Sequence, residues 1–304
     1  MSWDDISYLC SKYTPQFLWG TLNTLILAII GTLGGLLIGI FAGQARNIKV
    51  NKDDKWYVKG PKKALIWLTA VYVTLFRGTP MMVQGMVFFY VIPLIKFGDF
   101  QMDISAVTAS GNWGYVFNGY MYLGLFVITI NTGAYMTEIV KSGMNGVDSG
   151  QGEAARSLGL SSSETLWGVT LPQAIKNCLP TIGNEYVVNI KDSSVLNIIG
   201  VSELFYQAKN IAVLSYRILG AYMIIAFIYL FLTIIADWVI RLIDRKLKMP
   251  EKRFVDIFFH YRPERLKAKE TQAETTKAKA QEEEGKFIPV MNVGPDGDAK
   301  QQNF

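Results

Sequence analysis

The feature that most constrains this chain is a long uncharged stretch close to its beginning. From Phe17 to Gly43 there is no Asp, Glu, Lys or Arg. A helix needs about 20 mainly apolar residues to cross the hydrocarbon layer of a bilayer. The stretch is longer than the apolar part of a cleaved signal peptide, and it follows Asp4 and Asp5 where such a peptide is positively charged. We therefore expect an uncleaved membrane-spanning helix.

The rest of the chain has the composition of a membrane protein. Hydrophobic residues make up 50% of it and charged residues 18%, whereas charged residues make up about a quarter of an average soluble domain. The apolar residues lie in long runs, and the expected spans are residues 17–43, 64–95, 120–140, 172–201 and 216–240. These runs predict an all-α integral membrane protein with about five transmembrane helices.

The distribution of Lys and Arg predicts the orientation of these spans. The connection after the first span and the segment after the last one are strongly basic, whereas the connection 96–119 has one Lys and two Asp. Basic loops stay on the cytoplasmic side. We therefore expect the segment 1–16 outside the cell, a transmembrane domain over 17–247, and a cytoplasmic tail over 248–304. The tail is charged and repetitive, which predicts that it is largely disordered.

Several chemical functions have no support in the sequence. Cys10 and Cys178 are expected near opposite faces of the membrane, too far apart for a disulfide. The single His260 has no second ligand at a usable spacing, so we expect no metal site. The phosphate-binding sequence GxxxxGK[ST] does not occur. We expect no catalytic residue and no cofactor bound by this chain, and the net positive charge is explained by topology without nucleic acid.

The loop between the third and fourth spans is too polar to cross the membrane and lies on the expected cytoplasmic side. Asp148 or Ser149 can cap a first short helix there. Gly159 is placed to end that helix in the left-handed conformation. Ser161 and Glu164 have the spacing of a capping box at the start of a second helix. The loop therefore predicts a compact helix-turn-helix that projects from the membrane.

This loop, residues 148–171, resembles the EAA loop of ABC-importer permeases. The residues that carry the resemblance are Glu153, Ala154, Ala155 and Gly159, followed by Leu171 and Pro172. The resemblance implies that the loop docks into a groove of a separate ABC ATPase subunit, which would hold ATP and Mg²⁺.

Three other side chains of the loop are suited to such a contact. Arg156 can pair with an acidic group of the partner, and Leu166 and Trp167 offer an apolar anchor. The alternative is an ordinary helical hairpin at the surface.

Two more stretches resemble the polar amino acid importer permeases of this family, of the glutamine and glutamate type. They are Phe76 to Pro80 with Gln84, and Gly183 and Asn184 with Lys191 to Ser194. The resemblance covers residues 15–247 and implies the type I ABC-importer permease architecture in a bacterial plasma membrane. It also implies a second permease subunit, identical or homologous, two ATPase subunits and an extracellular substrate-binding protein. Glutamine or glutamate is the expected substrate, and cationic amino acids and cystine stay open.

An amino acid crosses as a zwitterion and needs polar groups within the membrane, where isolated charges are costly. We expect Glu185 to meet the ammonium group and Arg77 to meet the carboxylate, or else to have a structural role. Prolines and glycines predict a broken fourth span with free backbone groups. The full set of substrate-path candidates is Arg77, Gln84, Asn131, Asn184, Glu185, Asn189, Lys191 and Asp192.

Two packing patterns and one rival function complete the expectations. Glu138 and Lys141 have helical spacing and are expected to form a local ion pair. The rival function is a secondary amino acid transporter or channel that needs no ATPase. Glycines recur at every fourth position of the first span, which permits close approach of another helix within the subunit or at an interface between subunits; they are Gly31, Gly35, Gly39 and Gly43.

Overall fold

The computed structural model describes residues 3–48, 50, 55–97, 100–101, 104, 114, 116 and 118–248. Contacts within the chain separate it into a unit of Met1–Leu247 and a unit of Lys248–Phe304. The expected tail, with His260, lies outside the described residues except for Lys248. So does most of the connection 96–119.

The described residues are mainly helical. The helices are α1 (Trp3–Arg46), α2 (Trp56–Gly78), α3 (Met81–Val91), α4 (Gly119–Asn145), α5 (Ser149–Ser157), α6 (Ser162–Thr165), α7 (Leu171–Asp192), α8 (Leu204–Ser215) and α9 (Ile218–Lys248). Shorter helical segments are Ile92–Leu94, Leu166–Thr170 and Ser193–Ile199. The two-residue strands β1 (Lys96–Phe97) and β2 (Phe100–Gln101) pair antiparallel, with Lys96 opposite Gln101.

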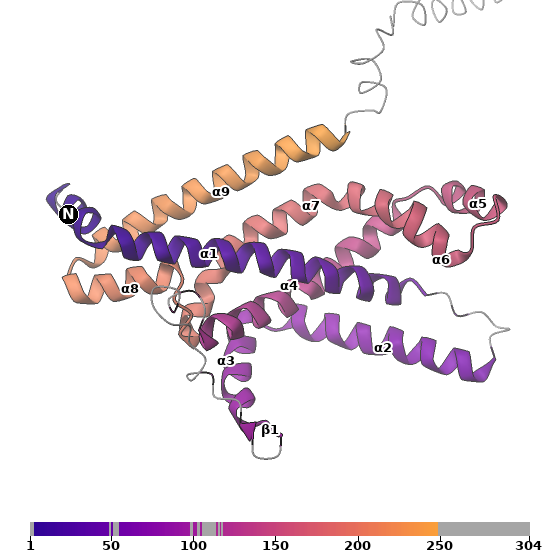
Figure 1. Ribbon diagram of the computed structural model, residues 1–304, viewed down its shortest axis with the longest axis horizontal. Coiled ribbons are helices and arrows are strands. Elements are labelled where there is room, and N and C mark those ends of the chain that lie inside the picture. Colours follow the sequence, from indigo (N-terminus) through magenta and orange to yellow (C-terminus); the bar gives the residue numbers. More distant parts are fainter. Residues whose placement is uncertain are drawn as a thin grey trace, which may run out of the picture. The chain divides into compact units, whose positions relative to one another are not determined.

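Figure 1 shows a bundle in which the N-terminus and α8 lie at one end, and α5, α6 and the start of α2 lie at the other. Among the described residues, α1, α4 and α9 are long and apolar enough to cross a membrane, and α2 with α3 qualifies if the bent pair is one span. Helix α7 does not pass this test, in keeping with its many polar residues. Which end faces the cytoplasm stays a prediction.

Helix α1 is longer than the first predicted span. Its 44 residues would extend over about 66 Å if straight, roughly twice the thickness of the hydrocarbon layer. The segment 1–16 is thus helical from Trp3 onward. This end of α1 packs on α8 and α9 through Leu9, Tyr13 and Phe17, which contact buried residues of both helices. An ion pair of 3.3 Å between Asp5 and Arg217 ties the same end together.

The glycine stripe of α1 packs against α4 within the subunit. A Cβ atom at Gly31 would overlap Ile128, and one at Gly39 would overlap Met136. The remaining close approaches are Gly35 to Thr132 and Gly43 to Val140. The interpretation as close packing within one subunit is therefore correct for these four glycines.

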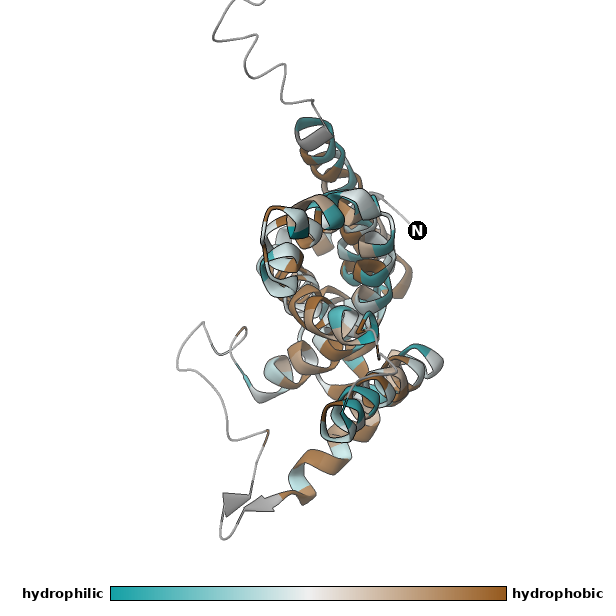
Figure 2. Ribbon diagram, turned by 90° about the vertical axis from the view of Figure 1, so that its right-hand side faces the viewer, coloured by the Kyte–Doolittle hydropathy of each residue, from teal (hydrophilic) through white to brown (hydrophobic). Residues whose placement is uncertain are grey.

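The second predicted span, 64–95, is two helices. Helices α2 and α3 differ in direction by 110°. Pro80 has no N–H to continue α2, and its ring favours an extended conformation of the preceding residue. Thr79 has that conformation, with φ −120° and ψ 144°. The expectation of one span is therefore corrected to a sharply broken pair, and α3 is the mostly brown helix next to the strands in Figure 2.

The fourth span is broken only near its end. Helix α7 continues through Pro180 and Gly183 to Asp192, where a 3₁₀ segment follows, and Gly200 has a φ of 87°. Helix α8 then begins, although the sequence reasoning did not expect it. The fully buried carboxylate of Glu203 caps α8 by accepting from the backbone N–H groups of Phe205 (2.8 Å) and Tyr206 (2.7 Å).

Candidate functional site

The loop over residues 148–171 has the predicted helix-turn-helix geometry. The Asp148 side chain caps α5 by accepting from the backbone N–H of Gly150 at 2.8 Å. Gly159 has a φ of 88°, and the backbone N–H of Leu160 donates to the carbonyl of Ala155 at 3.2 Å. This left-handed residue ends α5 as glycine commonly ends helices.

A reciprocal pair of hydrogen bonds starts the second helix of the loop. The backbone N–H of Ser161 donates to Glu164 at 2.8 Å, and the N–H of Glu164 donates to the Ser161 hydroxyl at 3.3 Å. These hydrogen bonds hold the pKa of Glu164 below its ordinary value. Helix α6 then passes through a π-helical turn into α7 without leaving the helical conformation. The capping box was predicted correctly, and the join to α7 was not foreseen.

The loop separates side chains that pack inward from side chains that face outward. Ala155 is buried, and Leu166 packs partly on a cluster of α4 and α7 residues. Glu153, Ala154 and Arg156 are exposed. Trp167 is 47% exposed and its ring lies 6.2 Å from that of Phe41. The two residues of the predicted apolar anchor therefore differ. Leu166 packs within the subunit and supports the loop, whereas Trp167 remains accessible to a partner.

Leu158 was missed by the sequence reasoning. It directly precedes Gly159 and is 83% exposed, so almost its whole side chain is accessible to a partner. Its position next to the left-handed glycine was the signal that this residue lies at the tip of the loop.

Gln84 and Asn131 meet at the break between α2 and α3. The Gln84 amide donates to the carbonyls of Phe76 and Thr79, at 2.9 Å each, and Asn131 donates to the Gln84 side-chain oxygen at 2.9 Å. Both side chains are buried. They satisfy carbonyls that the broken helix leaves without intrahelical donors. The structure therefore places these two candidates in a structural clamp.

Asn189 likewise joins helices in the interior. It accepts from the Thr132 hydroxyl at 3.0 Å and donates to the Thr32 hydroxyl at 2.9 Å, which links α7 to α4 and α1. All three side chains are buried. Thr132 and Asn189 therefore form helix-to-helix contacts in the interior.

The remaining candidates include a charged cluster. Glu185 lies close enough to Asp192 and Arg77 for electrostatic interaction with both. The Arg77 guanidinium stands over the Tyr135 ring, 5.3 Å from its centroid. Arg77 is exposed, whereas Glu185 and Asp192 are half-buried. Lys191 interacts electrostatically with Asp192, although the two are neighbours in the sequence.

A polar face extends from this cluster along α7. Asn177, Thr181, Glu185 and Asp192 recur at helical spacing, and Asn184 is exposed beside them. On α4, the residues Tyr135, Glu138 and Ser142 also recur at helical spacing and share one face. The two faces meet in a cavity of about 600 Å³, lined by Glu138, Ile139, Ser142, Gly143, Gly146, Asn177, Cys178 and Thr181.

Sequence reasoning missed Ser142, Asn177 and Thr181, although the recurrence of polar residues at helical spacing was available as a signal.

Sequence reasoning also predicted the wrong partner for Glu138. Glu138 forms an ion pair with Arg46, not with Lys141, because the end of α1 packs along α4 and brings the guanidinium to it. Exposed polar groups of a membrane helix face protein or water, not lipid.

Comparison with known families identifies the chain. The model of the binding-protein-dependent transport system inner membrane component matches residues 56–249. The chain belongs to this family. Its members are membrane components of transport systems, so the task of this chain is transport and not catalysis, and its place is the inner membrane.

Two relatives of this inner membrane component align with it over nearly their whole lengths. The glutamine transport system permease protein GlnP of Escherichia coli (strain K12) is 32% identical over 235 residues, which cover 77% of this chain and 94% of the relative. The arginine transport system permease protein ArtQ of Bacillus subtilis (strain 168) is 28% identical over 234 residues, covering 77% and 93%.

Solved structures of this transporter class share the fold. A crystal structure of an amino acid ABC transporter with histidines is 30% identical, has a TM-score of 0.63, and is covered in full by 81% of this chain. The MetNI methionine ABC transporter, in an inward-facing conformation, has a TM-score of 0.57 at 13% identity, with 77% of this chain and 97% of that one covered. The predicted all-α ABC permease fold is confirmed.

Proposed function

We propose that this inner membrane component carries a polar amino acid into the cell as the permease subunit of an ABC importer, with glutamine as the first candidate. The observation that most supports this proposal is the exposed polar face of α4 and α7, which ends in the cavity between them. Such a face in a membrane subunit suits a water-filled path or a covering partner. The names of GlnP and ArtQ support an amino acid as the cargo.

The charges of Glu185 and Asp192 on this face, together with Arg77 of α2, are complementary to a zwitterion. Glu185 and Asp192 would attract the ammonium group, and Arg77 would attract the carboxylate. Gln84, Asn131 and Asn189 would then act by holding the helices, not by touching the substrate.

The loop over residues 148–171 would couple this path to the ATPase. Its exposed Glu153, Ala154 and Arg156 with Leu158 and Trp167 form a surface of charged and apolar groups suited to a protein groove. ATP and Mg²⁺ would be bound by two partner ATPase subunits. A second permease, identical or homologous, and an extracellular binding protein would complete the importer.

Uptake of labelled glutamine, glutamate, aspartate, arginine, histidine and cystine tests this function in cells that lack the chain, with and without its restoration. We expect the uptake of one or two substrates to depend on the chain, and to be lost in Glu185→Gln and in Gly159→Asp. If uptake persists in Gly159→Asp with a correctly inserted protein, the secondary transporter without an ATPase becomes the better explanation.

A further inference from the structure

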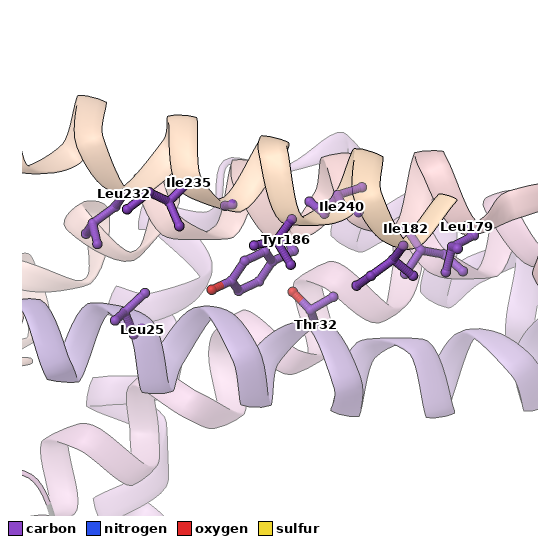
Figure 3. Close-up of a pocket in the computed structure, with 12 residues that line it drawn as sticks. Leu25, Thr32, Leu179, Ile182, Tyr186, Leu232, Ile235 and Ile240 are labelled. Atoms are coloured by element: carbon purple, nitrogen blue, oxygen red, sulfur yellow. The ribbon is translucent and has the colours of Figure 1, made fainter. Parts of the chain in front are cut away.

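An apolar cavity of about 530 Å³ lies between α1, α7 and α9 (Figure 3). Figure 3 shows Leu232 and Ile235 of α9 above it, Leu25 of α1 below it, and the Tyr186 ring between them. Among the described residues that line it, Thr32 and Tyr186 have polar side chains, and the Thr32 hydroxyl already accepts from Asn189. The other residues that line it are Leu179, Ile182, Gly183, Ala236, Val239, Ile240 and Ile243.

The cavity is open along one side of a loosely packed helix. Helix α9 approaches α7 closely at Gly183, where an added Cβ atom would overlap Ile240. Elsewhere along α9, the side chains on its outward face are exposed, such as Phe231 at 63% and Trp238 at 61%. Protein interiors are close-packed, and a cavity with apolar walls does not hold water. In a membrane, the material beside such an opening is the acyl chain of a lipid.

Two lysines extend the lining faces beyond one end of the cavity. On α7, Lys176 precedes Leu179 by three residues, which places it one turn further along the same face. On α9, Lys246 follows Ile243 by three residues in the same way. Both are exposed, and within the part of the chain that the structure describes neither takes part in an ion pair.

Two neighbouring charges of α9 interact within the chain, whereas Arg245 is exposed beside Lys246 and could add to the positive charge there. Arg241 pairs with Asp237, and Asp244 has an interaction within the chain. Lys176 and Lys246 are the cations that continue the lining faces of α7 and α9 at this end of the cavity. Basic groups between transmembrane helices, beside an apolar groove, suit the headgroups of anionic lipids.

We propose that this cavity is a binding site for an anionic phospholipid. One acyl chain fills the space between α1, α7 and α9, and the phosphate lies between Lys176 and Lys246. The ammonium groups recognise the negative headgroup, and the apolar walls hold the chain. The site is separate from the polar face of α4 and α7, since its residues occupy the opposite side of α7.

The test measures bound lipid directly, on the full chain with its natural partners in nanodiscs. The nanodiscs contain phosphatidylcholine alone or with phosphatidylglycerol, and native mass spectrometry counts the lipids that remain bound after release from the disc. We expect retention of phosphatidylglycerol over phosphatidylcholine. Each of Lys176→Gln and Lys246→Gln should weaken that preference about fivefold, whereas Lys209→Gln on α8 should not change it.

A second pair of variants tests the cavity itself. Ala236→Leu narrows the cavity and should reduce the retention of both lipids, whereas Ile234→Phe adds volume on an exposed position outside it and should not. Equal retention of the two lipids by the unaltered protein would overturn the headgroup assignment. Unchanged retention in Ala236→Leu, with the protein folded, would overturn the site.

Discussion

Individual polar residues inside this inner membrane component serve mainly to hold backbone and helices. Gln84 and Asn131 supply the donors that the break before Pro80 removes from the carbonyls of α2. An unsatisfied carbonyl is more costly in a membrane interior than in water. A polar side chain that lies as deep in the membrane as the transport path is therefore not by itself evidence of a contact with substrate.

Replacing Gln84 with Leu should destabilise the protein strongly. It leaves the carbonyls of Phe76 and Thr79 without this donor, and an unsatisfied buried group costs about 1–3 kcal/mol. The measurement is thermal unfolding in nanodiscs, with Thr74→Val on the exposed side of α2 as the matched control. An equal loss of stability in both variants would contradict the clamp.

Replacing Gly159 with Val should disrupt the loop. The φ of 88° is unfavourable for a β-branched residue, and a left-handed residue with a side chain costs roughly 1–2 kcal/mol. The ratio of the ordered to the disrupted loop should fall about five- to thirtyfold, and we expect lower uptake as a result. Gly159→Asn is the control, because Asn tolerates this conformation; if it reduces uptake as much as Val does, backbone conformation is not the reason.

Helix pairs in this subunit depend on how closely their backbones approach. The four glycines of α1 allow the extensive contact with α4, and α4 in turn contacts α7 and α2. Helix α4 is consequently the most buried of the apolar spans. In a membrane, close van der Waals packing of this kind holds helices together.

Gly39→Ala should therefore destabilise the protein by about 1–3 kcal/mol. The new Cβ atom would lie 2.7 Å from the backbone carbon of Met136, which cannot move independently. Gly60→Ala is the comparison, because the space around Gly60 is open and Ala is the better helix former there. Unfolding of both variants in the same detergent checks this, and equal stability would argue against the close approach.

The start of α6 should depend on pH through Glu164. Because its pKa is lower in the folded state, the carboxylate contributes stability above the unfolded pKa of about 4.3, and that contribution is lost as pH falls through the folded pKa. The protection of amides 161–165 against hydrogen exchange, measured relative to the intrinsic exchange rate at each pH, should therefore fall in this acid range. In Glu164→Gln this dependence should disappear; if it persists, another group controls the turn.

At the scale of the whole molecule, the exposed surface shows where other molecules are needed. The polar face of α4 and α7 is unsuited to contact with lipid, and the loop over residues 148–171 presents the exposed Leu158 to a partner. Together they fit a subunit of a larger importer.

Leu158→Asp should separate the permease from its ATPase subunits without unfolding it. Leu158 is 83% exposed, so its replacement removes little packing within the chain. We expect co-purification of the ATPase subunits to fall at least tenfold while the melting temperature stays the same. Arg46→Gln, which breaks the internal pair with Glu138, is the contrasting variant and should lower the melting temperature.

The sequence by itself determined the membrane character, the helical fold, the family, and the local geometry of the loop over residues 148–171. These depend on features that are local in the chain: uncharged runs, a capping box, and a glycine where a helix must end. Local chemistry of this kind is visible to sequence reasoning because its partners lie within a few residues.

Only the tertiary structure decided which distant residues meet. In the structure, Asn131 forms a hydrogen bond with Gln84, and Glu138 forms an ion pair with Arg46 and not with Lys141. Helix α3 also differs sharply in direction from α2. The tertiary structure also placed the polar face and the apolar cavity on opposite sides of α7. Helical spacing tells which residues share a face, but the helix that packs on that face depends on contacts between segments far apart in the chain.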